Sequence, residues 1–309
     1  YPSVSSTEYL ESIYNRDLRY VEQYLTLGGN PNLRDEWGST LLHVAIRVSD
    51  INIVDILLRK SANVHLEDAY GNTPLHIACI YGEQTAAQLL IAHGAHVDGT
   101  SPKRTWTPLM LALNEEKIEL AEWLMERGAD PNFVEPTQGW TPLLVACELG
   151  LRDICLKLIQ QGGKVDATLT AGDERGRSAM HLVAYNGQVE LARALVRKGA
   201  DVNAQPIGGG LSPLHWAVYN DHHRLMEFLL AEGANPNNQA KGIYQGRTPL
   251  HYVISSRREN MLYKILEHGA DPLLKDAESR SPLDIAWSCY EDTEKPLYRR
   301  MIRTMEAFL

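Results

Sequence analysis

The tetrapeptide Thr73-Pro74-Leu75-His76 recurs with little change along this chain of 309 residues. Related tetrapeptides begin at seven other positions, namely Thr40, Thr107, Thr141, Ser178, Ser212, Thr248 and Ser281. Successive starts are separated by 33, 34, 34, 37, 34, 36 and 33 residues. A nearly constant period of this kind indicates one supersecondary unit that is copied and stacked, so that each copy contacts its neighbours.

The copy from Thr73 to Gly94 shows what the unit is. Thr73 is a suitable cap, and Pro74 suits the first turn of a helix, where its missing N–H is not needed. The apolar pattern that follows predicts a short helix ending near Gly82, and then a second helix with Ala86, Leu89, Leu90 and Ile91. The second helix is expected to end at Gly94, because a left-handed residue terminates many helices.

The helical pair keeps a constant length, since 21 residues separate the first Thr or Ser from this terminal Gly in six copies. The first copy carries Ser61 instead. Changes in period therefore fall in the connecting loops, which have sequences such as Gly199-Ala200-Asp201-Val202-Asn203. We expect these loops to project as hairpin-like fingers, with two extended ones within 163–177 and 234–247.

These residues resemble the ankyrin repeat family, whose repeats begin with Thr-Pro-Leu-His and exit through Gly-Ala-Asp-Val-Asn. The resemblance covers roughly residues 30–290 and implies an all-α, curved solenoid of helix-turn-helix units with finger loops. It makes residues 1–309 a single ankyrin-repeat domain. Its repeats are 1–35 (an N-terminal capping pair), 36–68, 69–102, 103–136, 137–173, 174–207, 208–243, 244–276 and 277–309 (a C-terminal capping pair).

Both ends of the chain predict capping helices. Ser5 and Glu8 have the spacing of a capping box, and helical stretches are expected near 6–15 and 17–27. At the other end, one apolar helical face is expected, consisting of Leu297, Met301, Ile302, Met305 and Phe308.

Composition excludes several classes of protein. A net charge of −9 argues against general binding to nucleic acid, and no 18-residue apolar run predicts membrane insertion. Cys79 and Cys147 occupy a slot that is apolar in the other copies, including Trp287, so we expect core thiols. The absence of a Cys-x-x-Cys pair fits an intracellular protein, cytoplasmic or nuclear.

No motif in the sequence predicts catalysis, a cofactor or a bound metal. The fourth tetrapeptide position is His in five copies, and copies about 10 Å apart cannot share one ion, so structural hydrogen bonding is the better interpretation. These residues are His43, His76, His181, His215 and His251. The run Gly208-Gly209-Gly210 lacks the Lys-Ser/Thr of a phosphate-binding loop. We therefore expect a non-enzymatic protein.

In ankyrin proteins the free positions lie four, three and one residues before the tetrapeptide and seven and eight residues after it. Eight of these 40 positions are aromatic, against 7% of the whole chain. They are Trp37, Tyr70, Tyr81, Trp106, Trp140, Tyr185, Tyr219 and Tyr244. Exposed Trp and Tyr side chains are typical of protein interfaces.

The same 40 positions carry a small excess of positive charge. Seven are basic: Arg47, Lys103, Arg104, Arg175, Arg177, Arg247 and Arg280. Five are acidic: Glu36, Glu115, Glu148, Glu174 and Glu278. The concave side is therefore expected to be about +2 in an otherwise acidic molecule.

The function predicted from the sequence is binding of a protein or peptide segment along the concave groove. Trp106 and Trp140 are the expected central anchors, and the tyrosines widen the apolar strip. Arg104, Arg175 and Arg177 are expected to meet acidic groups of the partner. The remaining predicted contact residues are Trp37, Lys103, Tyr244 and Arg247.

Two alternatives belong to other classes. The first is a small-ligand sensor in which the finger tryptophans stack a nucleobase, while Lys103 and Arg104 hold phosphate. The second is a targeting module of a longer protein, such as a ubiquitin-ligase adaptor, a channel or a secreted bacterial effector.

Ankyrin proteins are also known substrates for asparagine hydroxylation in the loop. By resemblance the matching positions are Asn132, Asn203 and Asn237, whereas His65 and Asp166 depart from the pattern. We expect the intact mass of the protein from its native source to increase by one oxygen for each modified site. Peptide mapping that finds all three asparagines unmodified would contradict this expectation.

Overall fold

The computed structural model describes residues 6–172 and 175–309, with side chains from residue 9 onward. The chain separates into two compact units, Tyr1–Pro136 (unit 1) and Thr137–Leu309 (unit 2), and each is described by itself. The predicted capping box of Ser5 and Glu8 lies outside the described side chains.

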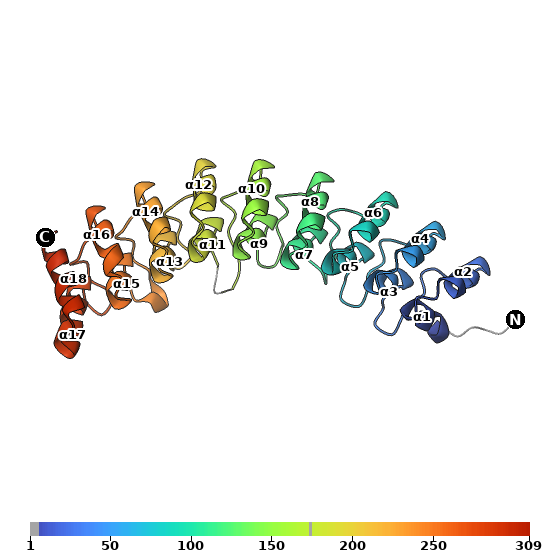
Figure 1. Ribbon diagram of the computed structural model, residues 1–309, viewed down its shortest axis with the longest axis horizontal. Coiled ribbons are helices and arrows are strands. Elements are labelled where there is room, and N and C mark those ends of the chain that lie inside the picture. Colours follow the sequence, from blue (N-terminus) through green and yellow to red (C-terminus); the bar gives the residue numbers. More distant parts are fainter. Residues whose placement is uncertain (1–5, 173–174) are drawn as a thin grey trace. The chain divides into compact units, whose positions relative to one another are not determined.

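Unit 1 consists of four helix pairs stacked side by side (Figure 1). The inner helices are α1 (Ser6–Tyr14), α3 (Leu41–Arg47), α5 (Pro74–Tyr81) and α7 (Pro108–Asn114). The outer helices are α2 (Leu18–Thr26), α4 (Ile51–Arg59), α6 (Gln84–Ala92) and α8 (Ile118–Glu126). Within the unit, each inner helix packs against its own outer helix, and successive inner helices pack against one another.

Unit 2 repeats this arrangement in five pairs (Figure 1). Its inner helices are α9 (Pro142–Glu148), α11 (Ala179–Asn186), α13 (Pro213–Tyr219), α15 (Pro249–Ser255) and α17 (Pro282–Thr293). Its outer helices are α10 (Arg152–Gln160), α12 (Val189–Arg197), α14 (His223–Ala231), α16 (Glu259–Glu267) and α18 (Pro296–Glu306). A short 3-10 helix, η1 (Gly242–Tyr244), lies in the finger before α15.

The helix ends confirm the interpretation of the repeat. Thr73 is extended and precedes Pro74 in the first turn of α5, which ends at Gly82 with φ of 76°. After the outer helices, the glycine predicted as the terminator has φ between 87° and 92° in all six copies, and Ser61 adopts φ of 61° in its place. Three fingers are closed by an isolated antiparallel bridge, for example Ala240 with Arg247. The described part of the chain is therefore an all-α ankyrin-type stack without extended strands.

In four repeats the tetrapeptide histidine links the repeat to the next one. The backbone N–H of Thr40 donates to Nδ1 of His43 at 3.1 Å, and the Thr40 hydroxyl lies 2.7 Å from the same nitrogen. Nε2 of His43 donates to the carbonyl oxygen of Asn72, in the finger of the next repeat, at 2.9 Å. A carbonyl only accepts, so the proton is on Nε2 and Nδ1 is the acceptor. The equivalent bonds from Nε2 join His76 to Trp106, His215 to Arg247 and His251 to Arg280.

The core consists of the apolar faces of the helix pairs, and it contains the predicted core thiols. Cys79 and Cys147 are completely buried, and burial raises the pKa of the Cys79 thiol. The same slot is filled by a buried apolar residue in five other copies, but Trp287 is 42% exposed. Trp287 therefore differs from the other residues of this slot; it lies on α17, which packs against α15 and α18.

The last helix also differs in detail from the expectation. Met301, Ile302 and Met305 are buried as predicted, but the helix buries Tyr298 as well, whose hydroxyl accepts from Nε of Arg257 at 3.0 Å. Phe308 lies beyond the end of α18 and is 40% exposed. Among the described helices, none is long and apolar enough to cross a membrane.

The histidine links predict a loss of stability in mild acid. Burial lowers the pKa of His43, His76 and His215 to about 4, whereas an unfolded chain has its histidine pKa near 6.5. Above pH 6.5 both states are neutral, and below it the unfolded chain binds protons first, so stability falls until about pH 4. We expect a loss of about 2 kcal/mol per histidine at about pH 5, because one pKa unit corresponds to about 1.4 kcal/mol.

Chemical denaturation followed by circular dichroism at about pH 7.5, 6 and 5 measures this effect. Ordinary carboxylates contribute little to this change in stability, because their pKa values near 4 leave them mostly ionised over this pH range. An unfolding midpoint that stays constant across the range would show that the imidazoles do not stabilise the stack in their neutral form.

Candidate functional site

The predicted aromatic contact residues project from the scaffold to different degrees. Five are exposed: Trp37, Tyr70, Tyr81, Tyr185 and Tyr219. Three are half-buried: Trp106, Trp140 and Tyr244. Trp106 belongs to unit 1 and Trp140 to unit 2, and neither indole is sealed inside the core. All eight positions therefore keep some surface that a partner can touch.

A buried carboxylate shapes the finger that carries Tyr70. Oδ1 of Asp68 accepts from the backbone N–H groups of Tyr70 and Asn72, both at 2.9 Å, so the loop closes into a tight turn. Asp35 forms the same turn around Trp37, and Asp276 forms it around Glu278. Hydrogen bonds from backbone N–H groups to a carboxylate are charge-assisted and strong, so they rigidify a loop. The aromatic residues of these fingers are therefore attached to an ordered backbone.

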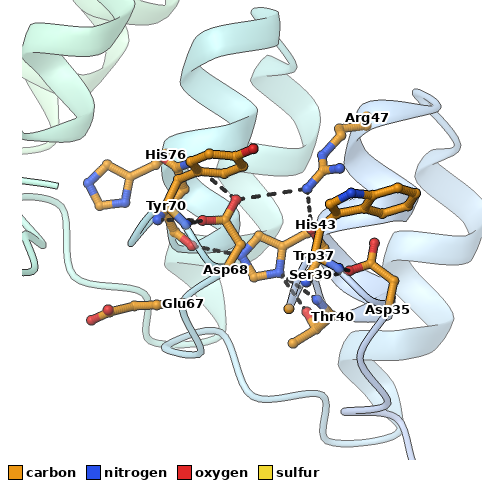
Figure 2. A network of polar contacts seen from close by, with 12 residues as sticks. Asp35, Trp37, Ser39, Thr40, His43, Arg47, Glu67, Asp68, Tyr70 and His76 are labelled. Carbon is orange, nitrogen blue, oxygen red and sulfur yellow. Dashed lines mark hydrogen bonds and ion pairs between the residues drawn. The ribbon is translucent and has the colours of Figure 1, made fainter. Parts of the chain in front are cut away.

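Figure 2 shows the polar network around Asp68 in unit 1. The guanidinium of Arg47, at the end of α3, lies 3.8 Å from Oδ2 of Asp68 and also donates to the Ser39 hydroxyl. Arg34 donates to the carbonyl oxygens of Gly38 and Glu67 at 2.5 and 2.6 Å, and so ties two successive fingers together. These arginines hold the fingers in place.

Most of the predicted cationic contact residues have the same structural task. Nζ of Lys103 donates to the carbonyl of Ala69 at 3.2 Å, and Nε of Arg104 donates to Oδ1 of Asn72 at 2.7 Å. Likewise, Arg247 lies 3.8 Å from the carboxylate of Asp276. Positive charge engaged in this way is less available to a ligand.

Arg177 departs furthest from the expectation. Its side chain was predicted to face acidic groups of a partner, but the residue is only 8% exposed and its guanidinium lies 5.5 Å from the centre of the Trp216 ring. The guanidinium is flat and weakly hydrated, so it stacks readily on an indole. Arg175, two residues earlier, remains exposed. Glu174 lies outside the described residues.

Unit 2 brings four aromatic rings together across three successive inner helices. We call this set the aromatic ladder: Tyr185 on α11, Trp216 and Tyr219 on α13, and Tyr252 on α15. Successive ring centroids are 5.4, 6.1 and 6.1 Å apart, and each pair meets edge to face. This is the preferred geometry of aromatic pairs. Tyr185 is 48% exposed and Tyr219 is 52% exposed, so the ladder has an open side.

Sequence reasoning found half of the ladder and missed Trp216 and Tyr252. Both lie four residues after the start of the tetrapeptide, a slot where five other copies have the buried aliphatic residues Val44, Ile77, Leu111, Val145 and Leu182. Trp216 and Tyr252 are half-buried there. An aromatic side chain is too large to disappear into a slot sized for Val or Leu. That size mismatch was the available signal.

The two units differ in charge. Unit 1 contains ten Lys and Arg residues against 19 Asp and Glu residues, whereas unit 2 contains 20 of each, so the formal charge of −9 belongs to unit 1. In unit 1 the acidic side chains include Glu119 and Glu126, both exposed on α8. A partner that carries acidic groups is therefore repelled less by unit 2.

The predicted hydroxylation sites are part of the loop structure. Nδ2 of Asn203 donates to the carbonyl of Gly233 at 3.0 Å, and its Oδ1 accepts from the N–H of Asn235 at 2.7 Å. Asn237 makes the same pair of bonds with the next repeat. The backbone N–H of Asn132 donates to Oδ1 of Asp130 at 2.8 Å. Hydroxylation at these positions stays a prediction.

Within the described residues, no group of three or more His, Cys, Asp or Glu side chains is arranged to hold a metal ion. The family model described as "Ankyrin repeats (3 copies)" matches residues 10–101, 98–171, 164–240 and 207–276. These matches together cover most of the chain.

Three relatives show how much of the chain is shared. The B-cell lymphoma 3 protein homolog of Mus musculus is 30% identical over 46% of this chain and 31% of its own length. The palmitoyltransferase ZDHHC13 of Homo sapiens is 36% identical over 32% of this chain and 16% of its own length. The nuclear factor NF-kappa-B p105 subunit of Mus musculus is 32% identical over 44% of this chain and 14% of its own length. The chain thus matches less than a third of each relative.

Among solved structures, the human ASB11 ankyrin repeat domain superposes with a TM-score of 0.61 at 25% identity. The superposition covers 74% of this chain and 98% of that domain.

The finger network predicts the effect of Asp68→Ala. This change leaves the N–H groups of Tyr70 and Asn72 without their acceptor, and an unpaired buried donor costs about 1–3 kcal/mol. We expect a lower unfolding midpoint and faster hydrogen exchange at those two amides. Glu36→Ala is the matched control, because Glu36 is an exposed carboxylate on the preceding finger. Equal midpoints and exchange rates in both variants would contradict the role of Asp68.

Proposed function

Because this chain belongs to the ankyrin repeat family, we propose that it is a protein-binding module whose main contact surface is the aromatic ladder of unit 2. Ankyrin repeats are protein–protein interaction modules and are generally non-enzymatic. The supporting observation is the open row of Tyr185, Trp216, Tyr219 and Tyr252 on three successive inner helices.

Exposing the apolar rings of the aromatic ladder to water is unfavourable in free energy. Its two exposed tyrosines present large apolar rings, and contiguous apolar surface of this kind marks interaction sites. Tyr and Trp side chains are enriched among the residues that dominate binding energy, because they bury large area and lose little side-chain entropy. The edge-to-face contacts hold each ring in place before binding, so a partner orders fewer side chains.

The ladder extends the contact surface expected from the sequence and does not replace it. In unit 2, Trp140 and Tyr244 lie on fingers and remain proposed contact residues. In unit 1, the proposed surface consists of Trp37, Tyr70, Tyr81 and Trp106. Arg175 remains the cation proposed to meet an acidic group, whereas the guanidinium of the buried Arg177 packs on the ring of Trp216.

The nucleotide-sensor alternative has less support. It requires Lys103 and Arg104 to bind phosphate next to Trp106, but both side chains already donate to groups of the preceding finger. The alternative of a targeting module within a longer protein stays open. It is consistent with relatives that are several times longer than the matched segment, one of them by name a palmitoyltransferase. An intracellular location and the absence of general nucleic-acid binding stay predictions.

The test compares partner capture by variants of the ladder. We expect Tyr185→Ala combined with Tyr219→Ala to weaken binding by roughly tenfold or more, because central interface aromatics commonly contribute about 2 kcal/mol. Both rings are exposed, so the fold should survive. Quantitative mass spectrometry of proteins retained by the immobilised chain gives the readout, and a Trp106→Ala, Trp140→Ala variant tests the finger anchors in parallel.

Tyr263→Ala is the matched control, since Tyr263 is 55% exposed on the outer helix α16. We expect this variant to retain the same proteins as the unmodified chain. If the ladder variant also retains them unchanged, the ladder is not the contact surface.

A further inference from the structure

Two thiols face each other inside the first helix pair of unit 2. Cys147 lies on the inner helix α9 and Cys155 on the outer helix α10, and both side chains are completely buried. Their sulfur atoms are 3.7 Å apart, so that one thiol donates to the other sulfur. The helices α9 and α10 pack directly against each other (Figure 1). This thiol pair, as we call Cys147 and Cys155, is therefore enclosed in the core of a single repeat.

The other repeats show that packing does not require sulfur at these two slots. In each of them the residue eight positions after the slot of Cys147 is also buried and apolar. The corresponding pairs are Ile46 with Val54, Cys79 with Ala87, Leu113 with Ala121, Ala184 with Ala192, Val218 with Met226, and Ile254 with Leu262. Among the four cysteines of the chain, only Cys147 and Cys155 occupy both slots of one repeat.

The geometry of the thiol pair suits a disulfide bond. An S–S bond is about 2.05 Å long, so the two sulfurs must approach by roughly 1.6 Å from their present separation of 3.7 Å. If both sulfurs share this movement, each moves by roughly 0.8 Å. A shift of this size is available from small rotations of the side chains and a slight approach of α9 to α10. The bond therefore forms without unfolding the repeat.

The environment of the pair determines when it reacts. A thiol must lose its proton before it attacks an oxidant or a second sulfur. The hydrogen bond with Cys155, together with burial, raises the pKa of the Cys147 thiol above its usual value. The closed core therefore holds this group as an unreactive thiol, and reaction requires a local opening of α9 and α10. When the helices close again, the nearest reactive group to either sulfur is the other sulfur.

We propose that Cys147 and Cys155 are an oxidation site, at which hydrogen peroxide converts the two thiols into a disulfide that joins α9 to α10. The peroxide oxidises one thiolate to a sulfenic acid and releases hydroxide. The second thiolate attacks that sulfur and displaces hydroxide, which forms the S–S bond. In sum, two thiols and one hydrogen peroxide give one disulfide and two molecules of water. The sulfurs are oxidised and the peroxide oxygens are reduced.

The disulfide acts on the neighbouring repeat through a side-chain amide. It closes a short loop between Cys147 and Cys155 and so opposes the separation of α9 from α10. Nδ2 of Asn186, the last residue of α11, donates to the carbonyl oxygens of Cys147 and Glu148 at 2.9 and 3.2 Å. The crosslinked end of α9 is thus bonded to the residue after Tyr185, the first ring of the aromatic ladder. Oxidation therefore makes local opening rarer at α9, α10 and the end of α11.

The experiment treats the reduced full chain with hydrogen peroxide at neutral pH, and then blocks free thiols in denaturant. All samples carry Cys289→Ser, because Cys289 is partly exposed and able to link two chains. We expect a protein that is two hydrogen atoms lighter, a linked peptide that contains Cys147 and Cys155, and full reversal by dithiothreitol. We also expect backbone amides of α9 and α10 to exchange about tenfold more slowly after oxidation.

Cys155→Ala is the matched variant, because it gives the repeat of Cys147 the same pair of residues as Cys79 and Ala87. We expect peroxide to leave its exchange rates unchanged and to form no linked peptide. Cys79 is an internal control, since it is a buried thiol in the same slot and should stay reduced.

Three results would overturn the inference. The first is that both thiols stay free in the folded protein, and the second is that sulfinic or sulfonic acid accumulates on them without a crosslink. The third is a crosslink that appears only when the chain is first unfolded in urea. A crosslink that leaves amide exchange unchanged would support the oxidation site and refute its effect on the opening of the helices.

Discussion

The bond from a neutral imidazole to the carbonyl of the next finger is the interaction on which the rest of the structure depends. At His76, Nδ1 accepts from the backbone N–H of Thr73, which caps the start of α5, while Nε2 donates to the carbonyl of Trp106. One side chain therefore starts an inner helix and fixes the neighbouring finger in position. The carbonyls of Arg247 and Arg280 are held in the same way by His215 and His251. These finger residues, among them the proposed contact residue Trp106, are thus bonded through their backbone carbonyls to buried histidines of the core.

The fingers repeat this logic with carboxylates. Asp68 and Asp276 are buried acceptors at the bases of their fingers, and each lies 3.8 Å from a guanidinium, that of Arg47 and that of Arg247 respectively. A buried carboxylate must be paired or hydrogen-bonded to remain charged, so these arginines are committed to the scaffold. Counting charges along the sequence overestimates the positive charge offered to a ligand for this reason. Arg177 shows the same effect with an aromatic partner, because its guanidinium is used to pack Trp216.

The helix pairs of this scaffold are constant in length, whereas the fingers vary in length and sequence. Helix pairs of fixed length keep the inner faces in register, so aromatic side chains from α11, α13 and α15 meet edge to face. Insertions fall in the fingers, where Gly, Gln and Ile build the tip around η1 without disturbing the helices. A surface assembled in this way varies in chemistry while its backbone stays the same.

The sequence by itself determined the repeat and the residues that begin and end its helices, because these depend on local chemistry. Pro74, Gly94 and His76 act within a few residues of their own positions, so a period of about 33 residues reveals them. It also identified the exposed tyrosines at positions 185 and 219 as surface residues. Tertiary structure decided the environment of residues at which one repeat differs from the others. Trp216 and Tyr252 remain half-buried because their slot is too small for an aromatic ring, and Arg177 is buried because an indole lies beside it. In each of these cases the outcome depends on neighbours far along the chain, and a local pattern carries no information about them.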